Sequence, residues 1–413
     1  MTMKDTRKYK QTELGLLPED WEVARLGDNV SDSCYGIGAE AISYNGVDKY
    51  LRITDITDEG HFAPNPLCSP AFFNESYIAT ENDLFVARTG ASVGKTYLYD
   101  SKDGRLIFAG FLMKLNITDA NSKFVFYYTQ TSQYKNWVIS ESMRSGQPGL
   151  NLKQIKNLSI PLPPIEEQRR IASALTSIDN LIDSLDRLIA KKRDIKQGAM
   201  QQLLSGKKRL KGFTEPWVEK KLGDMAETAS GGTPSRSNID YYKGHICWFT
   251  TSELTDNYLY DSNEHITNEA LSCSSAKLFP IGTLLIAMYG ATIGRLGILC
   301  TEAATNQACC AINCQKIDTI FLFYLLLLNR PNIIELGCGA GQPNISQDIV
   351  KNLEFIVPSS LPEQQAIASV LTSMDNELSA LEAKRKKYEQ IKQGMMQQLL
   401  TGRIRLENAS MVH

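Results

Sequence analysis

Three glycines near the end of the sequence could bring a backbone close to a cofactor. They are Gly337, Gly339 and Gly341, within the stretch IIELGCGAGQPN from Ile333 to Asn344. Two aliphatic residues and a carboxylate precede them, as in a strand that leads into a glycine-rich cofactor loop. The first chemistry to test is therefore methyl transfer from S-adenosylmethionine bound at this loop.

The rest of the sequence argues against a stand-alone methyltransferase, although this alternative stays open. Only 72 residues follow Gly341, whereas the sheet of such an enzyme needs several further strand–helix units. An Asn/Asp-Pro-Pro-aromatic motif, typical of these enzymes, does not occur in the sequence. We interpret the stretch as a helix end whose glycines lead into a turn.

A second glycine-rich stretch, GASVGKT from Gly90 to Thr96, resembles a phosphate-binding P-loop. A P-loop has four residues between its first glycine and the Gly-Lys pair, and here there are three. The residues that follow, YLY, favour a strand, whereas a P-loop opens a helix. We therefore predict a glycine turn between two strands, which offers backbone N–H groups and a basic side chain.

The cysteines and histidines do not show the spacing of a metal site, because the paired CxxC arrangement is missing. No nucleophile and base stand at a recognisable spacing either. We therefore predict buried, reduced thiols, with no metal, no cofactor and no catalytic residue. The residues considered are Cys309, Cys310, Cys314, His61, His245 and His265.

The sequence repeats itself, so the same elements must position two sets of side chains. Each copy has about 150 residues of globular sequence followed by about 40 of helical sequence, and most matching stretches lie 196 residues apart. The helical stretches are close copies, whereas the globular stretches match only at scattered positions. The clearest matches are EEQRRIASALTSIDN (166–180) with PEQQAIASVLTSMDN (362–376), KQGAMQQLLSG (196–206) with KQGMMQQLLTG (392–402), and RTGASVGK (88–95) with MYGATIGR (288–295).

Apolar residues in both helical stretches recur at alternating steps of four and three. This heptad seam needs a partner helix to bury it, so we predict that the two helices pair antiparallel. The alternative is that each helix docks only on its own domain. Lys192 and Arg385 interrupt the seam, and we expect Ile195 and Ile391 to resume it. The seam residues are Ile171, Leu175, Ile178, Ile182, Leu185, Ile189, Ile367, Leu371, Met374, Leu378 and Leu381.

Prolines and glycines mark where these helices begin and end. Pro163, Pro164 and Pro362 stand at the start, where proline is tolerated, and Gly206 and Gly402 stand where a C-terminal cap is expected. The predicted boundaries are a first globular domain at 1–164, a first helical region at 165–205, a linker at 206–211, a second globular domain at 212–360, a second helical region at 361–402, and a tail at 403–413.

Basic residues gather at the ends of both helical regions. Residues 186–211 contain nine Lys and Arg against two Asp, whereas the whole chain has a net charge of −2. A polyanion could bind there, although such a run is also typical of a solvated helix face. The most apolar run, Ile320 to Leu328, is shorter than a membrane span, and the N-terminus has no apolar core. We expect a cytoplasmic protein without a membrane segment.

Residue types that contact nucleic acid stand beside glycines and prolines in both globular halves. Arginine reads guanine edges, Asn and Gln read adenine, and Ser and Thr reach phosphates. The alternative is that the Asn, Gln and Thr residues stabilise turns. The candidate DNA contacts are Arg52, Arg88, Lys95, Arg144, Gln147, Asn151, Arg236, Ser237, Thr250, Thr251, Arg295, Asn306, Gln307, Gln342 and Asn344.

The repeated stretches, together with GGTPSRSN from Gly231 to Asn238, resemble the specificity subunit of type I restriction-modification systems. The resemblance implies an α+β fold, a tandem pseudo-repeat of two mixed α/β target recognition domains held apart by two long helices packed as an antiparallel coiled coil. In that family each domain reads one half of a split site in double-stranded DNA, and the helices set the gap. The subunit is non-catalytic, and it docks two modification subunits, which bind S-adenosylmethionine; restriction subunits join the complex. A protein-interaction scaffold is a further alternative.

Overall fold

The structure is a computed structural model that describes residues 8–143, 149–337 and 344–406. The chain divides into two units. Unit 1 contains residues 1–186 and 384–413, and unit 2 contains residues 187–383. The cuts fall inside the two long helices, so each unit includes part of both of them.

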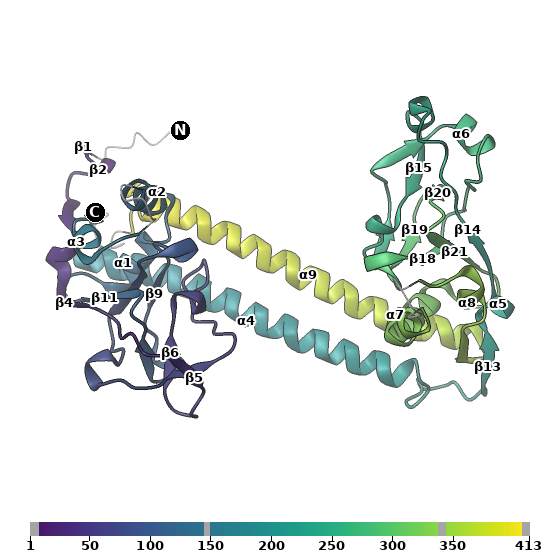
Figure 1. The fold of residues 1–413 in the computed structure, drawn as a ribbon, viewed down its shortest axis with the longest axis horizontal. Helices are drawn as coiled ribbons and strands as arrows, with labels where there is room; N and C mark the ends of the chain where they lie inside the picture. Colours follow the sequence, from purple (N-terminus) through teal and green to yellow (C-terminus); the bar gives the residue numbers. More distant parts are fainter. Residues whose placement is uncertain (1–7, 144–148, 338–343, 407–413) are drawn as a thin grey trace, which may run out of the picture. The chain divides into compact units, whose positions relative to one another are not determined.

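Unit 1 is built on a four-stranded antiparallel sheet in the order β4-β11-β8-β9 (Figure 1). The central strand β8 is buried on both faces, because Leu84 and Val86 belong to one apolar cluster and Phe85 and Ala87 to another. The strands are β4 (Val30–Tyr35), β11 (Leu112–Ile117), β8 (Asp83–Ala87) and β9 (Thr96–Leu98).

Smaller strand pairs and short helices complete the globular part of unit 1. The antiparallel pairs are β1 (Tyr9–Thr12) with β2 (Gly15–Pro18), β3 (Glu22–Arg25) with β12 (Ser159–Leu162), and β5 (Ala41–Ser43) with β7 (Cys68–Pro70). The parallel pair is β6 (Lys49–Leu51) with β10 (Leu106–Phe108). The helices are α1 (Ser122–Tyr128), α2 (Ser132–Ser142) and α3 (Leu152–Lys156).

Unit 2 repeats this plan and extends it. Its main sheet has the order β14-β21-β18-β19-β16, in which only the last pair is parallel. In β18, Leu284 and Ile286 face one cluster while Leu285 and Ala287 face another, as in β8. The strands are β14 (Ala226–Ser230), β21 (Cys309–Cys314), β18 (Leu284–Ala287), β19 (Leu296–Leu299) and β16 (Asn257–Leu259).

A second sheet of unit 2 joins β17 (Glu264–Ile266), β15 (Ile246–Phe249) and β20 (Ala303–Thr305) in that order. The β15–β20 pair is parallel, and it matches the parallel β6–β10 pair of unit 1. The remaining elements are the pair β13 (Trp217–Lys221) with β22 (Glu354–Pro358) and the helices α5 (Leu222–Met225), α6 (Asn268–Ser272) and α8 (Gln347–Lys351).

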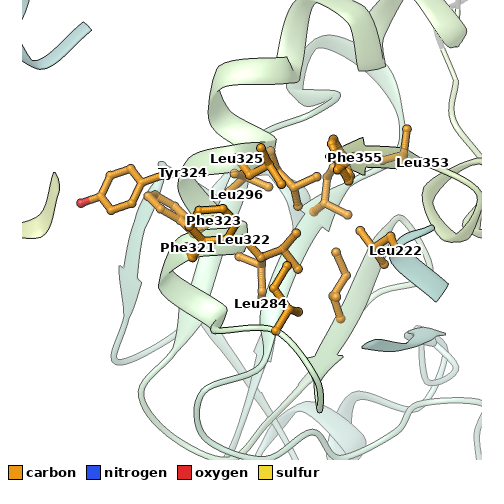
Figure 2. Packing of buried hydrophobic residues seen from close by; sticks show 14 of the residues in the cluster. Leu222, Leu284, Leu296, Phe321, Leu322, Phe323, Tyr324, Leu325, Leu353 and Phe355 are labelled. Atoms are coloured by element: carbon orange, nitrogen blue, oxygen red, sulfur yellow. The ribbon is translucent and has the colours of Figure 1, made fainter. Parts of the chain in front are cut away.

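The helix α7 (Thr319–Leu336) lies in the core of unit 2. Its length and a mean hydropathy of 1.3 would suffice to cross a membrane, and among the described residues it is alone in this. However, its first turns pack against the β-sheet, as Figure 2 shows for the segment 321–325 with Leu284 and Leu296. Burial in a protein core accounts for its apolar character.

The long helices α4 (Ile165–Leu203) and α9 (Leu361–Leu399) pack against each other and are antiparallel (Figure 1). In unit 1, Asp179 pairs with Lys392, and Asp186, further along α4, pairs with Arg385, earlier in α9. In unit 2, Lys192 pairs with Glu377 at 2.7 Å. This confirms the predicted tandem α+β fold with a paired coil. Gly206 and Gly402 follow the helix ends with φ of 70° and 68°, as expected of C-terminal caps.

In both long helices the heptad seam continues through a lysine and does not shift to the neighbouring isoleucine. Ile195 is 46% exposed and Ile391 is 39% exposed, so the expectation that they resume the seam was wrong. The positions in heptad phase are held by Lys196 and Lys392, whose aliphatic stems lie in the helix pair while their ammonium groups bind Asp375 and Asp179. The predicted seam residues are buried or half-buried; they are Ile171, Leu175, Ile178, Ile182, Leu185, Ile189, Ile367, Leu371, Met374, Leu378 and Leu381.

Candidate nucleic-acid interface

A glycine turn occupies the same place in both main sheets. In unit 1 it joins the antiparallel strands β8 and β9, and Gly90 and Gly94 take φ of 71° and 81°. In unit 2 it joins β18 and β19, and Gly290 and Gly294 take φ of 70° and 76°. The left-handed conformation explains why glycine stands at these four positions. The prediction of a strand–turn–strand in place of a P-loop is confirmed.

Arg88 and Tyr35 meet beside the turn of unit 1. The Arg88 guanidinium lies 4.6 Å from the centre of the Tyr35 ring, and the Tyr35 hydroxyl accepts a hydrogen bond from the backbone of Leu152. Among the described residues, no hydrogen-bond acceptor meets the buried Nε of Arg88. A buried donor without an acceptor costs free energy, and such groups often belong to binding sites.

The other three candidates of unit 1 within the described residues have protein partners. Asn151 caps α3 by accepting a hydrogen bond from Gln154 N. Lys95 lies 2.8 Å from Asp58, which holds the pKa of that carboxyl below its usual value. Arg52 donates to both oxygens of the buried Asp55, at 2.9 and 2.7 Å, so its guanidinium has a structural contact.

The turn of unit 2 carries different side chains. Met288 stands at the place of Arg88, and Arg295 is exposed at the end of the turn. Tyr289 pairs through its backbone with Asn344, just as Thr89 pairs with Gly149 in unit 1. The structure thus brings Arg295 and Asn344 to the same turn. Arg144, Gln147 and Gln342 lie outside the described residues.

A cluster around Arg236 forms a second polar surface in unit 2. The guanidinium lies 4.3 Å from the ring centre of Tyr242 and 5.0 Å from that of Trp248. It also donates to Glu264 at 2.8 Å, and this hydrogen bond lowers the pKa of the Glu264 carboxyl. Ser237 is exposed and bonds to Ser235. The arginine is therefore held in a fixed orientation while it is still 54% exposed.

The remaining candidates of unit 2 lie at the ends of β15 and β20. Thr250 caps a short turn with Glu253, and Thr251 begins that turn. Gln307 accepts a hydrogen bond from Thr233 at 2.5 Å. The Oδ1 atom of Asn306 is buried and meets no donor from the described part of the chain. Asn306 thus resembles Arg88 in presenting an unused polar atom.

The sequence analysis did not identify the aromatic residues that contact candidate arginines in each unit. The rings of Tyr35, Tyr242 and Trp248 contact the guanidinium groups of arginines from other strands or loops. A search for polar residues beside glycines cannot find them, because the contacts form only when the sheets assemble. The usable signal is the aromatic content near the GGTPSRSN stretch.

Buried ion pairs join the long helices to the globular part in the same way in both units. In unit 1, Arg405 donates to Glu167 at 2.7 and 2.6 Å and to Asp20, and Trp21 donates to Glu167 at 3.1 Å. In unit 2 the equivalent residues are Arg209, Glu363 and Trp217. These basic residues of the helix ends therefore serve the fold.

A second contact of this kind joins a tyrosine to both long helices. Tyr127 donates to Asp179 at 2.7 Å, and Lys392 from the other helix binds the same carboxylate at 2.7 Å. In unit 2, Tyr324 donates to Asp375 at 2.6 Å, and Lys196 completes the group. Burial, followed by the charge of Asp179, raises the pKa of Tyr127, so the hydroxyl remains a donor. Each domain is thus held at a defined place on the helix pair.

We expect the Glu167→Gln variant to lose about 2–4 kcal/mol of unfolding free energy, because the partly buried Arg405 loses the charge of its buried carboxylate partner. Urea unfolding followed by tryptophan fluorescence measures this change. Glu166→Gln is the matched control, since Glu166 is exposed and should change the free energy by less than about 0.5 kcal/mol. Equal losses in the two variants would contradict the assignment.

Cys309 and Cys310 of β21 are buried, as expected, whereas Cys314 at the end of the strand is only half-buried. Burial raises the pKa of the Cys309 and Cys310 thiols to about 12 and that of Cys314 to about 11. The stretch before Gly337 is the end of α7 and not a strand, so the glycines do not follow a strand as a methyl-donor loop requires. Gly339 and Gly341 lie outside the described residues.

Comparisons with known proteins agree with this arrangement. The family described as the type I restriction modification DNA specificity domain matches residues 18–191 and again residues 214–393. The chain is 28% identical to the type I restriction enzyme MjaVIII specificity subunit of Methanocaldococcus jannaschii, over 95% of each chain. It is 25% identical to the EcoR124I/EcoR124II specificity subunit of Escherichia coli, over 61% of this chain and 63% of that one.

A solved structure shares the fold. The S subunit of a type I restriction-modification system from M. genitalium matches with a TM-score of 0.62 and 16% identity, over 97% of this chain and 98% of that one. Because two copies of the family domain span most of its length, the chain belongs to the DNA specificity subunits of type I restriction-modification systems.

Proposed function

We propose that this chain reads a split site in double-stranded DNA, with one globular domain for each half-site, and that it docks two modification subunits. The helix pair sets the gap between the half-sites. The chain itself is non-catalytic and works in the cytoplasm. The modification subunits bring S-adenosylmethionine, and restriction subunits join the same complex.

The observation that carries this proposal is a set of exposed residues that the two helix copies share. Buried residues at equivalent positions of the two helix copies stay alike because they pack in the same way. Packing does not explain why exposed residues at equivalent positions are also the same. Each unit presents the same set, with one part from α4 and the other from α9. Two surfaces that share these exposed residues suit two copies of one partner. The shared exposed pairs are Ser173 with Ser369, Ser177 with Ser373, Asn180 with Asn376, Lys191 with Lys387, Ile195 with Ile391, Gln197 with Gln393, and Gln201 with Gln397.

The globular parts support two different half-sites. Their sheets and glycine turns match, yet the side chains on them differ, with Arg88 over Tyr35 in unit 1 and Met288 with Arg295 in unit 2. A guanidinium held against an aromatic ring can recognise a guanine edge in the major groove. The base contacts proposed are the candidates named above, and Arg88, Arg236, Arg295 and Asn306 have the best supported geometry.

The buried ion pairs tie each globular domain to the helix pair. Both α4 and α9 contribute to both units, which supports the proposal that their length sets the gap between the half-sites. A longer or shorter pair would therefore select a different gap without changing the half-sites.

DNA selection from a random pool tests this function, with the modification subunit present and methylated molecules sequenced. The native chain should enrich a motif of two short halves around an unspecified gap. We expect Arg295→Ala to relax one half about 10-fold or more at one or two base pairs, and to leave the other half unchanged. Arg169→Ala, an exposed helix arginine, is the control and should change neither half.

Other outcomes point to the other functions. Enrichment of no split motif would favour an interaction scaffold. Calorimetry of the isolated chain with S-adenosylmethionine tests the methyltransferase, and tight binding of one equivalent would overturn the proposal. A change in both halves with Arg295→Ala would contradict the assignment of one domain to each half-site.

A further inference from the structure

Three potential metal ligands of different chemistry converge in unit 2. Cys247 on β15 and His265 on β17 face each other across an antiparallel strand pair. Asp261 lies just before β17 and reaches the same point. Within the described residues this is the only group of three such side chains whose ligand atoms lie within 4.8 Å of one another.

The distances within the group suit a small divalent ion. Cys247 Sγ lies 3.7 Å from His265 Nε2 and 3.6 Å from Asp261 Oδ1, and His265 Nε2 lies 2.8 Å from Asp261 Oδ1. A point just outside the plane of the three atoms lies about 2.0 Å from His265 Nε2 and Asp261 Oδ1 and about 2.3 Å from Cys247 Sγ, which are the usual Zn–N, Zn–O and Zn–S bond lengths. Two tetrahedral zinc ligands stand roughly 3.3–3.6 Å apart, so only the hydrogen-bonded His–Asp pair must open slightly.

The proposed site is buried on the Cys247 side and open to solvent on the Asp261 side. Cys247 is buried with 7% exposure, whereas the side chains of His265 and Asp261 are 32% and 76% exposed. Thiolate and imidazole ligands favour zinc over magnesium or calcium, which prefer oxygen ligands. The open side next to Asp261 leaves room for a water molecule as the fourth ligand.

We propose that Cys247, Asp261 and His265 bind one zinc ion per chain. On binding, the Cys247 thiol releases its proton to solvent, and the His265–Asp261 hydrogen bond gives way to two bonds to the metal. Unit 1 cannot bind a second ion in the same way, because Lys49 stands at the place of Cys247 and donates to the Asp103 carbonyl. The sequence spacing hides this site, since its ligands are joined by strand pairing and not by a CxxC motif.

The ion would order the strand that holds Arg236. Glu264 and His265 are neighbours on β17, so their side chains point to opposite faces of that strand. Zinc on the His265 face fixes β17, and the other face holds the Glu264 carboxylate that binds Arg236. The metal is therefore structural, and it supports the polar surface without touching DNA.

The test loads the full chain with Zn²⁺, removes unbound metal by gel filtration, and measures zinc per chain. We expect about one equivalent, and at least 10-fold weaker binding for Cys247→Ser and for His265→Gln. Cys273→Ser is the matched control, because Cys273 is an exposed cysteine in the same unit and should leave binding unchanged. Retention of the same amount of zinc by the native chain and by Cys247→Ser would overturn the site.

A spectroscopic measurement on the native chain keeps the proposal testable where a variant fails to fold. Co²⁺ bound by a thiolate gives a charge-transfer absorption in the near ultraviolet, and Zn²⁺ should remove this band by displacement. Hydrogen exchange of residues 257–266 should slow on zinc addition, while residues 41–51 of unit 1 stay unchanged. A missing thiolate band, or equal exchange with and without zinc, would contradict the proposal.

Discussion

Removing one heptad from the middle of each long helix should shorten the gap between the two DNA half-sites by about three base pairs. Seven helical residues span about 10 Å, and base pairs stack 3.4 Å apart. The two half-site sequences should stay the same, because the globular domains are untouched. Methylation of the native site should fall below detection, and methylome sequencing reports the new gap.

The structure identifies which heptads can be removed. Residues 185–191 and 381–387 lie outside the tyrosine–aspartate–lysine groups that hold each domain. Their removal deletes Asp186 and Arg385 together, so no partner of that ion pair is left behind. A whole heptad also preserves the phase of the seam, so Lys192 can still meet Glu377.

The new site should be methylated more slowly than the native one. A gap shorter by about three base pairs turns one half-site by about 0.3 of a turn around the duplex. The DNA must twist to present both halves to the shortened chain, which costs free energy. A variant that lacks residues 185–191 alone is the control, and it should lose the paired register and activity. Full activity on the native gap by the double deletion would reject the role of the helices as a spacer.

Replacing both exposed isoleucines by aspartate, Ile195→Asp with Ile391→Asp, should weaken binding of the modification subunits by about 100-fold. Each isoleucine lies on the helix surface that both units share, and a carboxylate there would have to be desolvated on docking. Each single variant should still bind one modification subunit per chain. Native mass spectrometry counts the subunits in each complex.

The matched control for this pair is Leu188→Asp. Leu188 is 38% exposed on α4, but the equivalent residue of the other helix copy is Lys384. It is therefore not part of the shared surface, and its replacement should leave two subunits bound. Thermal unfolding should be similar for all these variants, because the substituted side chains face solvent. Two modification subunits bound tightly to the double variant would show that docking occurs elsewhere.

The fold was predictable because the residues that pack the helices and mark their ends recur in both copies of the repeat. The apolar steps in the two helical regions, the capping glycines and the prolines have the same spacing in both copies, so each copy checked the other. The exposed Ile195 shows the limit of this pattern. A lysine can hold a seam position when a carboxylate of the facing helix neutralises it, and no apolar periodicity reports such a pair.

Candidate base contacts are harder to predict from the sequence, since residues far apart in the chain decide whether a side chain is free to bind DNA. Arg52 and Arg88 look alike in sequence, yet Asp55 binds the first and the ring of Tyr35 supports the second. The group of Cys247, Asp261 and His265 likewise forms only when two strands pair. Such contacts follow from tertiary structure, and spacing along the chain does not reveal them.

The order of synthesis on the ribosome differs from the order in which the two units can be completed. Unit 1 begins at the first residue but needs Arg405, near the last, to neutralise the buried Glu167. Unit 2 has all of its residues once Ala383 has been made. The Arg405 partner of the N-terminal domain is therefore made only after every residue of unit 2. A stop codon shortly after Leu399 would leave unit 2 complete and deprive unit 1 of Arg405.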